Sequence, residues 1–428
     1  MPNKSRELMK HPLRQNRLIQ NAIALMVSSG GSALLGVAFW VLAARLAPTS
    51  VIGKTTAEIA AMVLLATIAQ LSFGSIFERF LPVAGELTRR FIARSYVLTL
   101  STALVFSVGY EVLGFGHHFL EEGIASKAFF LVAVIAWTIF ALQDSALIGL
   151  RASRWVAVEN IGYGIAKLAL LPCFLIVSKA QGTIISWVIP VIVADALVSL
   201  YLFRVRIPGH IEASTRTEDL PTTRELVILS GAQYASVLTT VFLPALVTLL
   251  VIQRLGAVEN AYYYLPAMIS NSLGTFAWSI ARSFLVEASH EPHALRQHAN
   301  SAIKGLTVVL VPSIVLGVIF APEYLRVFGA GYAAHGTALM RMLLISLSGV
   351  AVMVFYSTFA WLDKRVWWLT ARNVVFSVVY VLIVLLLLGH YGINSIGIAS
   401  LVYSGLTALM FLPMSIRRYR RIESVPVA

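Results

Sequence analysis

The chain has 428 residues, of which 58% are hydrophobic and only 12% are charged. A soluble domain is about 45–50% apolar and about 25% charged, so this composition excludes an ordinary soluble protein and requires a bilayer as solvent. The net charge is +13. Because the basic residues stand in short clusters between apolar runs, this charge indicates membrane topology, and we expect no nucleic-acid partner.

Long apolar runs follow one another along the whole chain. A membrane-spanning helix needs about 20 predominantly apolar residues, and the sequence offers about twelve such runs. We therefore expect an all-α integral membrane protein. The predicted spans are residues 18–46, 56–77, 92–114, 125–149, 155–178, 183–203, 225–252, 260–284, 302–321, 335–361, 367–389 and 393–416.

Lysine and arginine are distributed unequally between the two sides of the predicted membrane. Most of them fall in the N-terminal tail, in alternate inter-helix segments and in the cluster from Arg417 to Arg421. The side that is rich in Lys and Arg is cytoplasmic in membrane proteins. We therefore expect both termini in the cytoplasm.

The longest predicted inter-helix segments lie on the cytoplasmic side, and one of them divides the chain into two halves. This linker covers 206–223 and contains Pro, Gly and Ser residues. The predicted organisation is a basic tail, an N-terminal lobe of six helices, the linker, a C-terminal lobe of six helices and a second tail. Apart from the linker, these segments cover 1–17, 18–205, 224–416 and 417–428.

Several different short motifs follow one another along the chain. They are Gly36 to Leu46 followed by Pro48 and Gly53, Leu71 to Pro82, Leu325 to Tyr332, and Gly392 to Ser400 ahead of the tail Arg417 to Arg421. Together they resemble the first helix and outer turn, the exit of the second helix, the outer loop after helix nine and the last helix of the Wzx-type polysaccharide-export flippases. These flippases are a branch of the multidrug/oligosaccharidyl-lipid/polysaccharide (MOP) superfamily.

The resemblance implies both a fold and a function. It implies two six-helix lobes around a central cavity in the bacterial inner (plasma) membrane. It also implies translocation of a polyprenyl-diphosphate-linked oligosaccharide for cell-surface polysaccharide biosynthesis. The expected partners are this lipid-linked oligosaccharide, membrane lipids and other polysaccharide assembly proteins. No cofactor is expected, and coupling to a proton or sodium gradient stays open.

Lys167 is the clearest candidate for a functional residue. It lies about 17 Å from either end of its predicted helix, which is too far for its side chain to reach either interface. Asn160, Tyr163 and Gly164 share its helical face. Because intramembrane charges are functional by default, we expect Lys167 to bind the diphosphate of the carrier, with Asn160 and Tyr163 beside it. The structural alternative is an ion pair with Asp195, which also lies in mid-span.

Other polar residues near the predicted spans are candidates for substrate contact. Arg79 and Arg282 lie at the cytoplasmic ends of their helices, where they either contact the diphosphate or only set the topology. Arg341 lies about two turns from the outer end of its predicted helix, so its side chain either contacts the substrate or reaches the outer membrane interface. Asn271 and Trp278 lie on a polar face that suits a sugar, although helix packing would also explain that face.

Acidic residues within the spans are candidates for ion coupling. These residues are Asp195, Asp144 and Glu159, of which Asp195 and Asp144 are the better candidates by depth. A proton- or sodium-coupled transporter needs such groups. The alternative is that each is a partner for a nearby cation or hydroxyl group.

Rival functions remain open at this point. A multidrug and toxin extrusion (MATE)-like drug/cation antiporter of the same superfamily would place an acid, rather than Lys167, at the centre of the cavity. A membrane polysaccharide polymerase or ligase would carry a large outer loop with catalytic residues, and the predicted outer loops are short. We expect a protein that is not an enzyme. A scaffold for the assembly machinery would tolerate loss of Lys167.

Overall fold

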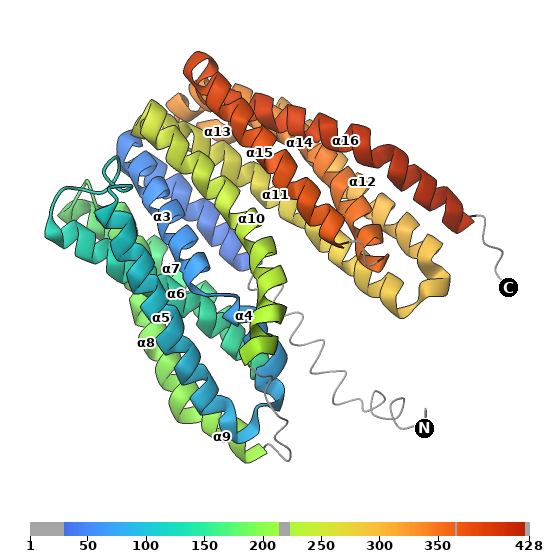
Figure 1. Ribbon diagram of the computed structural model, residues 1–428. Coiled ribbons are helices and arrows are strands. Elements are labelled where there is room, and N and C mark those ends of the chain that lie inside the picture. The colour runs from blue at the N-terminus through green and yellow to red at the C-terminus, as the bar shows by residue number, and fades with distance from the viewer. Residues whose placement is uncertain (1–29, 214–222, 364–365, 424–428) are drawn as a thin grey trace. The chain divides into compact units, whose positions relative to one another are not determined.

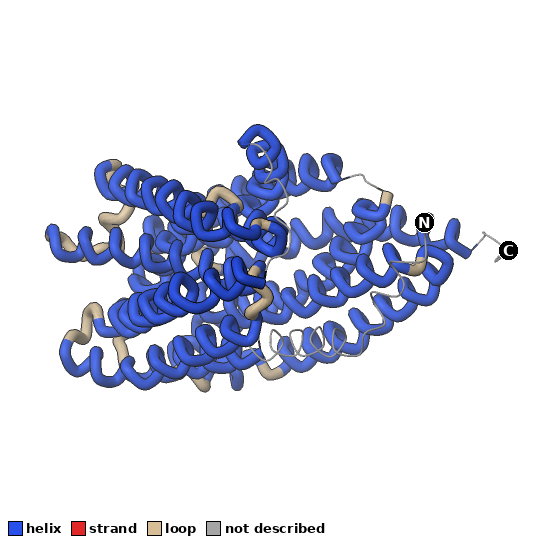
Figure 2. The backbone as a smooth tube through the Cα atoms, turned by 90° about the horizontal axis from the view of Figure 1, so that it is seen from below, coloured by secondary structure: helices blue, strands red, loops and turns tan. Residues whose placement is uncertain are grey.

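The computed structural model describes residues 30–213, 223–363 and 366–423, and within these ranges the chain is helical with no strand (Figures 1 and 2). Nine helices of the described chain are long and apolar enough to cross a membrane. The remaining predicted spans correspond to α11 and to two shorter apolar stretches, Gly30–Leu46 and Val241–Leu255. The prediction of an all-α integral membrane protein is confirmed.

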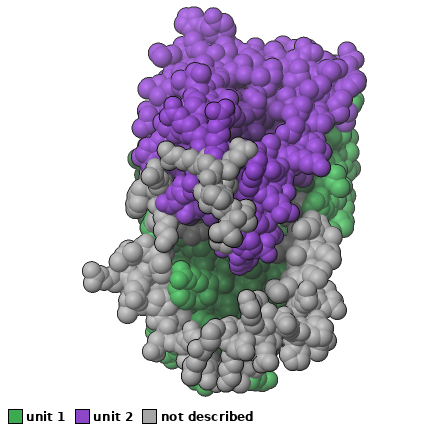
Figure 3. All heavy atoms as spheres, turned by 90° about the vertical axis from the view of Figure 1, so that its right-hand side faces the viewer, with its two compact units in different colours: residues 1–51, 57–245 green, residues 52–56, 246–428 purple. Residues whose placement is uncertain are grey.

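The chain divides into two compact units, which Figure 3 shows in green and purple. Unit 1 comprises residues 1–51 and 57–245, and unit 2 comprises residues 52–56 and 246–428. Helix α10, Thr223–Leu255, passes from the first unit into the second. Most of α3, Thr49–Ala69, belongs to unit 1, and its residues 52–56 belong to unit 2. Unit 1 also holds the first helix Gly30–Leu46, α4 Phe73–Phe80, α5 Thr88–Val112, α6 Ile124–Gly149, α7 Ser153–Val177, α8 Gly182–Tyr201 and α9 Ile207–Ala213.

Unit 2 is built from the helices that follow α10. They are α11 Ala257–His290, α12 Leu295–Ile319, α13 Ala321–Arg326, α14 Ala330–Leu362, α15 Val366–Tyr391 and α16 Asn394–Glu423. Helix α14 packs extensively against both α16 and α11. It is therefore the central helix of this unit.

The second predicted span does not form one continuous helix. Leu71 and Ser72 have φ angles of 48° and 62°, which are left-handed, so α3 ends at Ala69 and α4 begins at Phe73. A left-handed residue other than glycine costs about 1–2 kcal/mol and cannot continue a right-handed helix. The expectation of an unbroken helix over 56–77 was wrong at this point.

The start of the predicted linker is also helical. A π-helical turn at Leu202–Arg206 continues from α8 and leads directly into α9. The Arg206 guanidinium donates hydrogen bonds to the carbonyl oxygens of Leu150 and Arg151, at 2.6 and 3.3 Å. These bonds tie the helical segment to the turn between α6 and α7. Residues 214–222 of the predicted linker lie outside the described residues.

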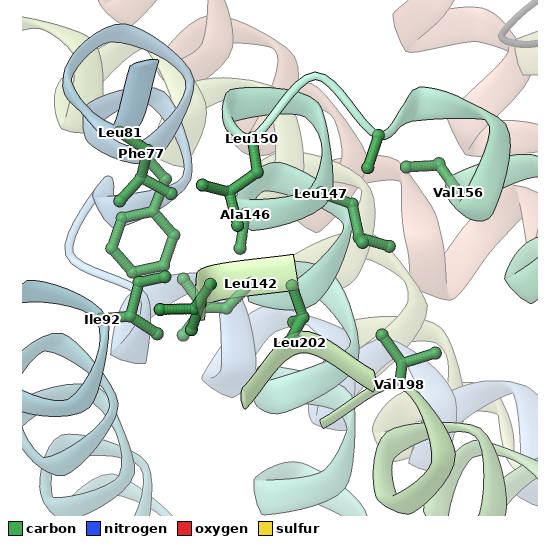
Figure 4. Packing of buried hydrophobic residues seen from close by; sticks show 12 residues of the cluster. Phe77, Leu81, Ile92, Leu142, Ala146, Leu147, Leu150, Val156, Val198 and Leu202 are labelled. Atoms are coloured by element: carbon green, nitrogen blue, oxygen red, sulfur yellow. The ribbon is translucent and has the colours of Figure 1, made fainter. Parts of the chain in front are cut away.

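A buried apolar cluster holds the helices of unit 1 together (Figure 4). Phe77 and Leu142 contribute from α4 and α6, and Val198 contributes from α8. Gly149 permits the close approach of α6 to α4, because a Cβ atom there would lie 2.5 Å from the carbonyl oxygen of Phe77. Small residues at such contacts are typical of membrane helices, whose association depends on close packing.

Candidate functional site

Unit 1 encloses a cavity of about 290 Å³. Its walls come from the first helix and from α6, α7 and α8, so it lies within one compact unit. The lining residues are Ser32, Trp137, Phe140, Ala141, Asp144, Asn160, Tyr163, Gly164, Lys167 and Trp187. The four residues that share a helical face in the sequence, from Asn160 to Lys167, all line this cavity.

Close packing between the first helix and α7 shapes one wall of the cavity. A Cβ atom at Gly164 would lie 2.7 Å from Leu35 Cδ1 and 3.1 Å from Leu35 Cβ. Glycine at this position therefore lets the first helix approach α7. The same contact brings Ser32, one turn earlier on the first helix, to the cavity that Lys167 lines.

Aromatic rings surround the ammonium group of Lys167. Its Nζ lies 3.7 Å from the ring centroid of Trp187, 4.6 Å from that of Tyr163 and 5.3 Å from that of Phe39. A cation within about 6 Å of a ring centroid is attracted by the negative face of the ring. The side chain is only 5% exposed. The aromatic rings therefore hold a buried cation at the wall of the cavity.

The ion pair between Lys167 and Asp195 does not form. Both side chains lie in the described part of the chain, and they are not within the 4.0 Å of a salt bridge. Both carboxyl oxygens of Asp195 are buried and lack a hydrogen-bond partner among the described residues. The geometry therefore gives no support to the structural alternative for Lys167.

Three acidic residues lie on the helices that line the cavity. Asn160 Nδ2 donates to both carboxylate oxygens of Asp144 at 3.0 Å, and it also reaches the carbonyl oxygen of Val156. The carboxyl oxygens of Glu159 are buried and, like those of Asp195, have no hydrogen-bond partner in the described ranges. Only Asp144 lines the cavity itself, and Asn160 fixes its orientation there.

The aromatic wall was not anticipated from the sequence. Trp137 and Phe140 on α6 stack at 5.5 Å between ring centroids, and Tyr163 meets Trp187 edge-on at 6.2 Å. One signal was present, because Trp137 lies near the middle of its predicted span, as Lys167 does in the next one. Tryptophan usually lies at membrane interfaces, so one in mid-span is a sign of an internal site.

The other predicted site residues do not join this cavity. Arg79 is exposed beside the ring of Phe80, and Arg282 is exposed on α11. Asn271 and Trp278 are also exposed on α11. Arg341 on α14 has a partner, because its Nε donates to a carbonyl oxygen of α12, that of Val318, at 3.0 Å. This bond gives Arg341 a structural role in joining two helices.

Arg372 is a buried cation that the sequence analysis did not single out. It lies on α15 with its guanidinium 4.6 Å from the ring centroid of Phe411, and it donates to Tyr403 Oη at 3.3 Å. Its side chain is 6% exposed. Its position near the start of a predicted helix resembles that of a topology-setting arginine, which is why the sequence gave no signal.

Comparisons with known proteins identify the fold. No family model and no curated protein matches the sequence. Solved structures do match over most of the chain. A multidrug resistance MATE family transporter of the MOP superfamily, in an inward-facing conformation, has a TM-score of 0.61 at 13% identity and covers 92% of this chain and 96% of its own.

Two further structures extend this likeness. A MOP superfamily transporter from Pyrococcus furiosus, described as having a binding pocket of reversed polarity, gives a TM-score of 0.58 at 13% identity, covering 96% of both chains. The MATE transporter ClbM in complex with Rb⁺ gives a TM-score of 0.54 at 16% identity, and the match covers 95% of this chain and 96% of the ClbM chain. The chain therefore has the fold of these transporters.

Proposed function

We propose that this protein is a MOP-superfamily transporter that moves a polyprenyl-diphosphate-linked oligosaccharide across the bacterial inner membrane. Its fold is that of MATE transporters of this superfamily. Its sequence motifs resemble the Wzx-type branch, whose members export polysaccharide precursors. The fold supports transport, and the motifs together with the cavity of unit 1 support the choice of substrate.

The observation that carries this proposal is a buried lysine, at the wall of a cavity, that has no acidic partner among the described residues. A diphosphate that crosses hydrocarbon needs a fixed counter-charge, since an isolated anion is strongly disfavoured there. Lys167 supplies that charge, because none of the ion pairs within the described chain involves it. Attraction to Trp187 and Tyr163 keeps the cation in place when the site is empty.

The cavity is suited to one end of the substrate. Its volume of about 290 Å³ is at the lower limit of about 300–1,000 Å³ for pockets that enclose a drug-sized ligand. It therefore accepts a phosphate group or a sugar ring rather than a complete oligosaccharide. Aromatic rings such as Trp137 offer apolar faces on which a sugar ring can stack, and the amide of Asn160 can hydrogen-bond to sugar hydroxyls.

The acidic residues are the proposed site of ion coupling. Glu159 and Asp195 hold buried carboxyl oxygens without partners in the described chain, and Asp144 lies at the cavity itself. Uptake of a proton or a sodium ion would neutralise such a group and change how it interacts with its surroundings. The MATE transporter ClbM, which has this fold, has been solved in complex with Rb⁺.

Deletion of the gene tests the direction and the substrate of transport. Without the transporter, the finished lipid-linked oligosaccharide should accumulate on the cytoplasmic leaflet and polymerisation outside the membrane should stop. The measurement is the accessibility of the glycan to a membrane-impermeant lectin in spheroplasts. Single repeat units accumulating on the outer leaflet would indicate a polymerase instead.

A drug/cation antiporter is the second candidate, and two observations favour it. The matching solved structures include multidrug transporters, and three acids lie on the helices around the cavity. The two functions respond differently to loss of the cation at Lys167. An antiporter for cationic drugs should keep or gain drug resistance in a Lys167→Met variant, whereas an exporter of anionic substrates should lose export.

A further inference from the structure

Two residues with a left-handed backbone interrupt the helical chain between α3 and α4. Leu71 and Ser72 have φ angles of 48° and 62°, and α4 begins at Phe73 (Figure 1). Residues other than glycine rarely adopt this conformation, so the break stores strain. Strained residues persist only where the surrounding structure holds them, and they are frequent at ligand clamps and switch regions.

A hydrogen bond from another helix compensates for the break. In a continuous α-helix the carbonyl oxygen of Ile68 would accept from the N–H of Ser72, four residues later. In the structure this oxygen accepts instead from the hydroxyl group of Tyr234 on α10, at 3.0 Å, and from the N–H of Leu71, at 3.4 Å. The acceptor therefore has two alternative donors, Tyr234 in the broken helix and Ser72 in a continuous one.

Packing against α6 holds α4 in place after the break. A Cβ atom at Gly74 would lie 2.9 Å from Ser145 Oγ, so α4 lies close against α6 at this point. The side chain of Phe77, one turn later, is completely buried. Because α4 is held in this way, closing the break would move α3 rather than α4.

The two helices that this hydrogen bond joins are also the helices in which the chain passes between the compact units. It crosses from one unit to the other at residues 51–52 and 56–57, in α3, and at residues 245–246, in α10. A rearrangement of the units must therefore be accommodated by both helices. The bond between Tyr234 and Ile68 lies within unit 1.

We propose that the break is a two-state hinge, in which the carbonyl oxygen of Ile68 exchanges its donor between the hydroxyl group of Tyr234 and the N–H of Ser72. The bond to Tyr234 and the packing of α4 favour the broken state. The left-handed residues oppose it, because their strain is released when the helix becomes continuous. A small change at α10 then shifts the population of α3 between the two states. The inference concerns a conformational step of transport and is independent of the substrate.

The distance between two spin labels tests the hinge in the purified full-length protein. The single cysteine is removed by Cys173→Ala, and the labels are attached after Lys54→Cys and Arg79→Cys, at two exposed positions. A continuous helix would place the backbones of these positions about 37 Å apart, since each residue adds about 1.5 Å, and a bend shortens this distance. Double electron–electron resonance gives the ratio of the continuous to the broken population.

Removal of the Tyr234 hydroxyl group should shift the hinge towards the continuous state. Tyr234→Phe should raise the ratio about two- to tenfold, which corresponds to the loss of one hydrogen bond. Tyr110→Phe is the matched control, because the hydroxyl group of Tyr110 on α5 is buried and has no hydrogen-bond partner among the described residues. The control should give the ratio of the parent protein.

A glycine in the break should have the opposite effect. Ser72→Gly removes the strain of one left-handed residue, so it should lower the ratio about five- to thirtyfold and reverse the effect of Tyr234→Phe when the two are combined. The Ser72 side chain has no hydrogen-bond partner in the described ranges, so this substitution removes no side-chain bond. Equal ratios for Tyr234→Phe and Tyr110→Phe would overturn the proposal, because the bond would then only attach α10 to α3. So would a ratio in the Tyr234→Phe background that Ser72→Gly leaves unchanged.

Discussion

Lys167 combines burial, positive charge and the absence of an ion pair with the described acids. A structural lysine in a membrane protein is normally paired with a carboxylate or reaches the interface. Lys167 instead lies 3.7 Å from the ring centroid of Trp187 and contacts a cavity. Cation–π attraction amounts to about 2 kcal/mol for a desolvated site, which is less than the cost of burying an unpaired ammonium ion. We therefore propose that Lys167 binds an anionic ligand.

Variants of Lys167 separate a binding role from a structural one. Lys167→Met keeps the length of the side chain and removes its charge, so the protein level should be unchanged. A hydrogen bond between charged groups contributes about 1.5–3 kcal/mol, so export should fall about ten- to hundredfold. Lys167→Arg should retain part of the activity, because a guanidinium group is wider and binds phosphate with another geometry.

The double variant with Asp195→Asn is the control for this experiment. If Lys167 and Asp195 formed a pair, removing one partner would destabilise the protein by about 3–5 kcal/mol and removing both would restore it. The structure predicts no such rescue. Normal export by the double variant would contradict the binding role of Lys167, with protein level and export both measured.

For individual residues, the sequence predicted which side chains share one face of α7 but not which side chains of other helices surround them. Asn160, Tyr163 and Lys167 could be placed together because a helix has a fixed period. The contacts with Phe39 and Trp187 come from other helices, and one sequence does not specify which faces meet. The hydrogen bond from Arg341 to the carbonyl oxygen of Val318 also depends on how α12 packs. The sequence does not show that packing, so Arg341 was considered for substrate contact.

Helices α14 and α16 of unit 2 pack closely against each other at a glycine. A Cβ atom at Gly349 would lie 2.6 and 2.7 Å from the backbone O and Cα of Ser404. The Gly349 N–H also donates to Ser404 Oγ at 3.1 Å. Backbone atoms cannot move aside as a side chain can, so this contact requires glycine.

Gly349→Ala should therefore separate the two helices. Overpacking of this kind costs about 1–3 kcal/mol, and the effect should appear as a lower unfolding temperature of the detergent-purified protein. Gly405→Ala is the matched control on α16, because no atom lies within 4 Å of a Cβ atom there. Equal unfolding temperatures for the two variants would show that the helices do not meet at Gly349.

The elements themselves were largely predictable, and their interruptions were not. Within the described ranges every predicted span has a helical counterpart, because long apolar runs in a bilayer must satisfy their backbone hydrogen bonds internally. The break between α3 and α4 depends on left-handed φ angles at Leu71 and Ser72. Neither residue type favours that conformation, so the sequence carried no turn signal. Surrounding packing must impose it.

For the whole molecule, the distribution of Lys and Arg makes a topological prediction. A reporter fused after His118 should lie outside the cytoplasm, and one fused after His298 should lie inside it. Alkaline phosphatase, active outside, and green fluorescent protein, fluorescent inside, measure the two locations. The reverse result at one of these positions alone would mean that the number of spans between them differs from the prediction, because each additional span inverts every later loop.

Transport in a purified system tests the central claim most directly. The protein is reconstituted into vesicles that contain a fluorescent polyprenyl-diphosphate oligosaccharide, and the fraction in each leaflet is followed with an impermeant reagent that oxidises the glycan. The wild-type protein should move the glycan between leaflets much faster than protein-free vesicles do, and Lys167→Met should remove most of this acceleration. Transport by Lys167→Met at the wild-type rate, or no acceleration by the wild-type protein under a proton or sodium gradient, would contradict the account.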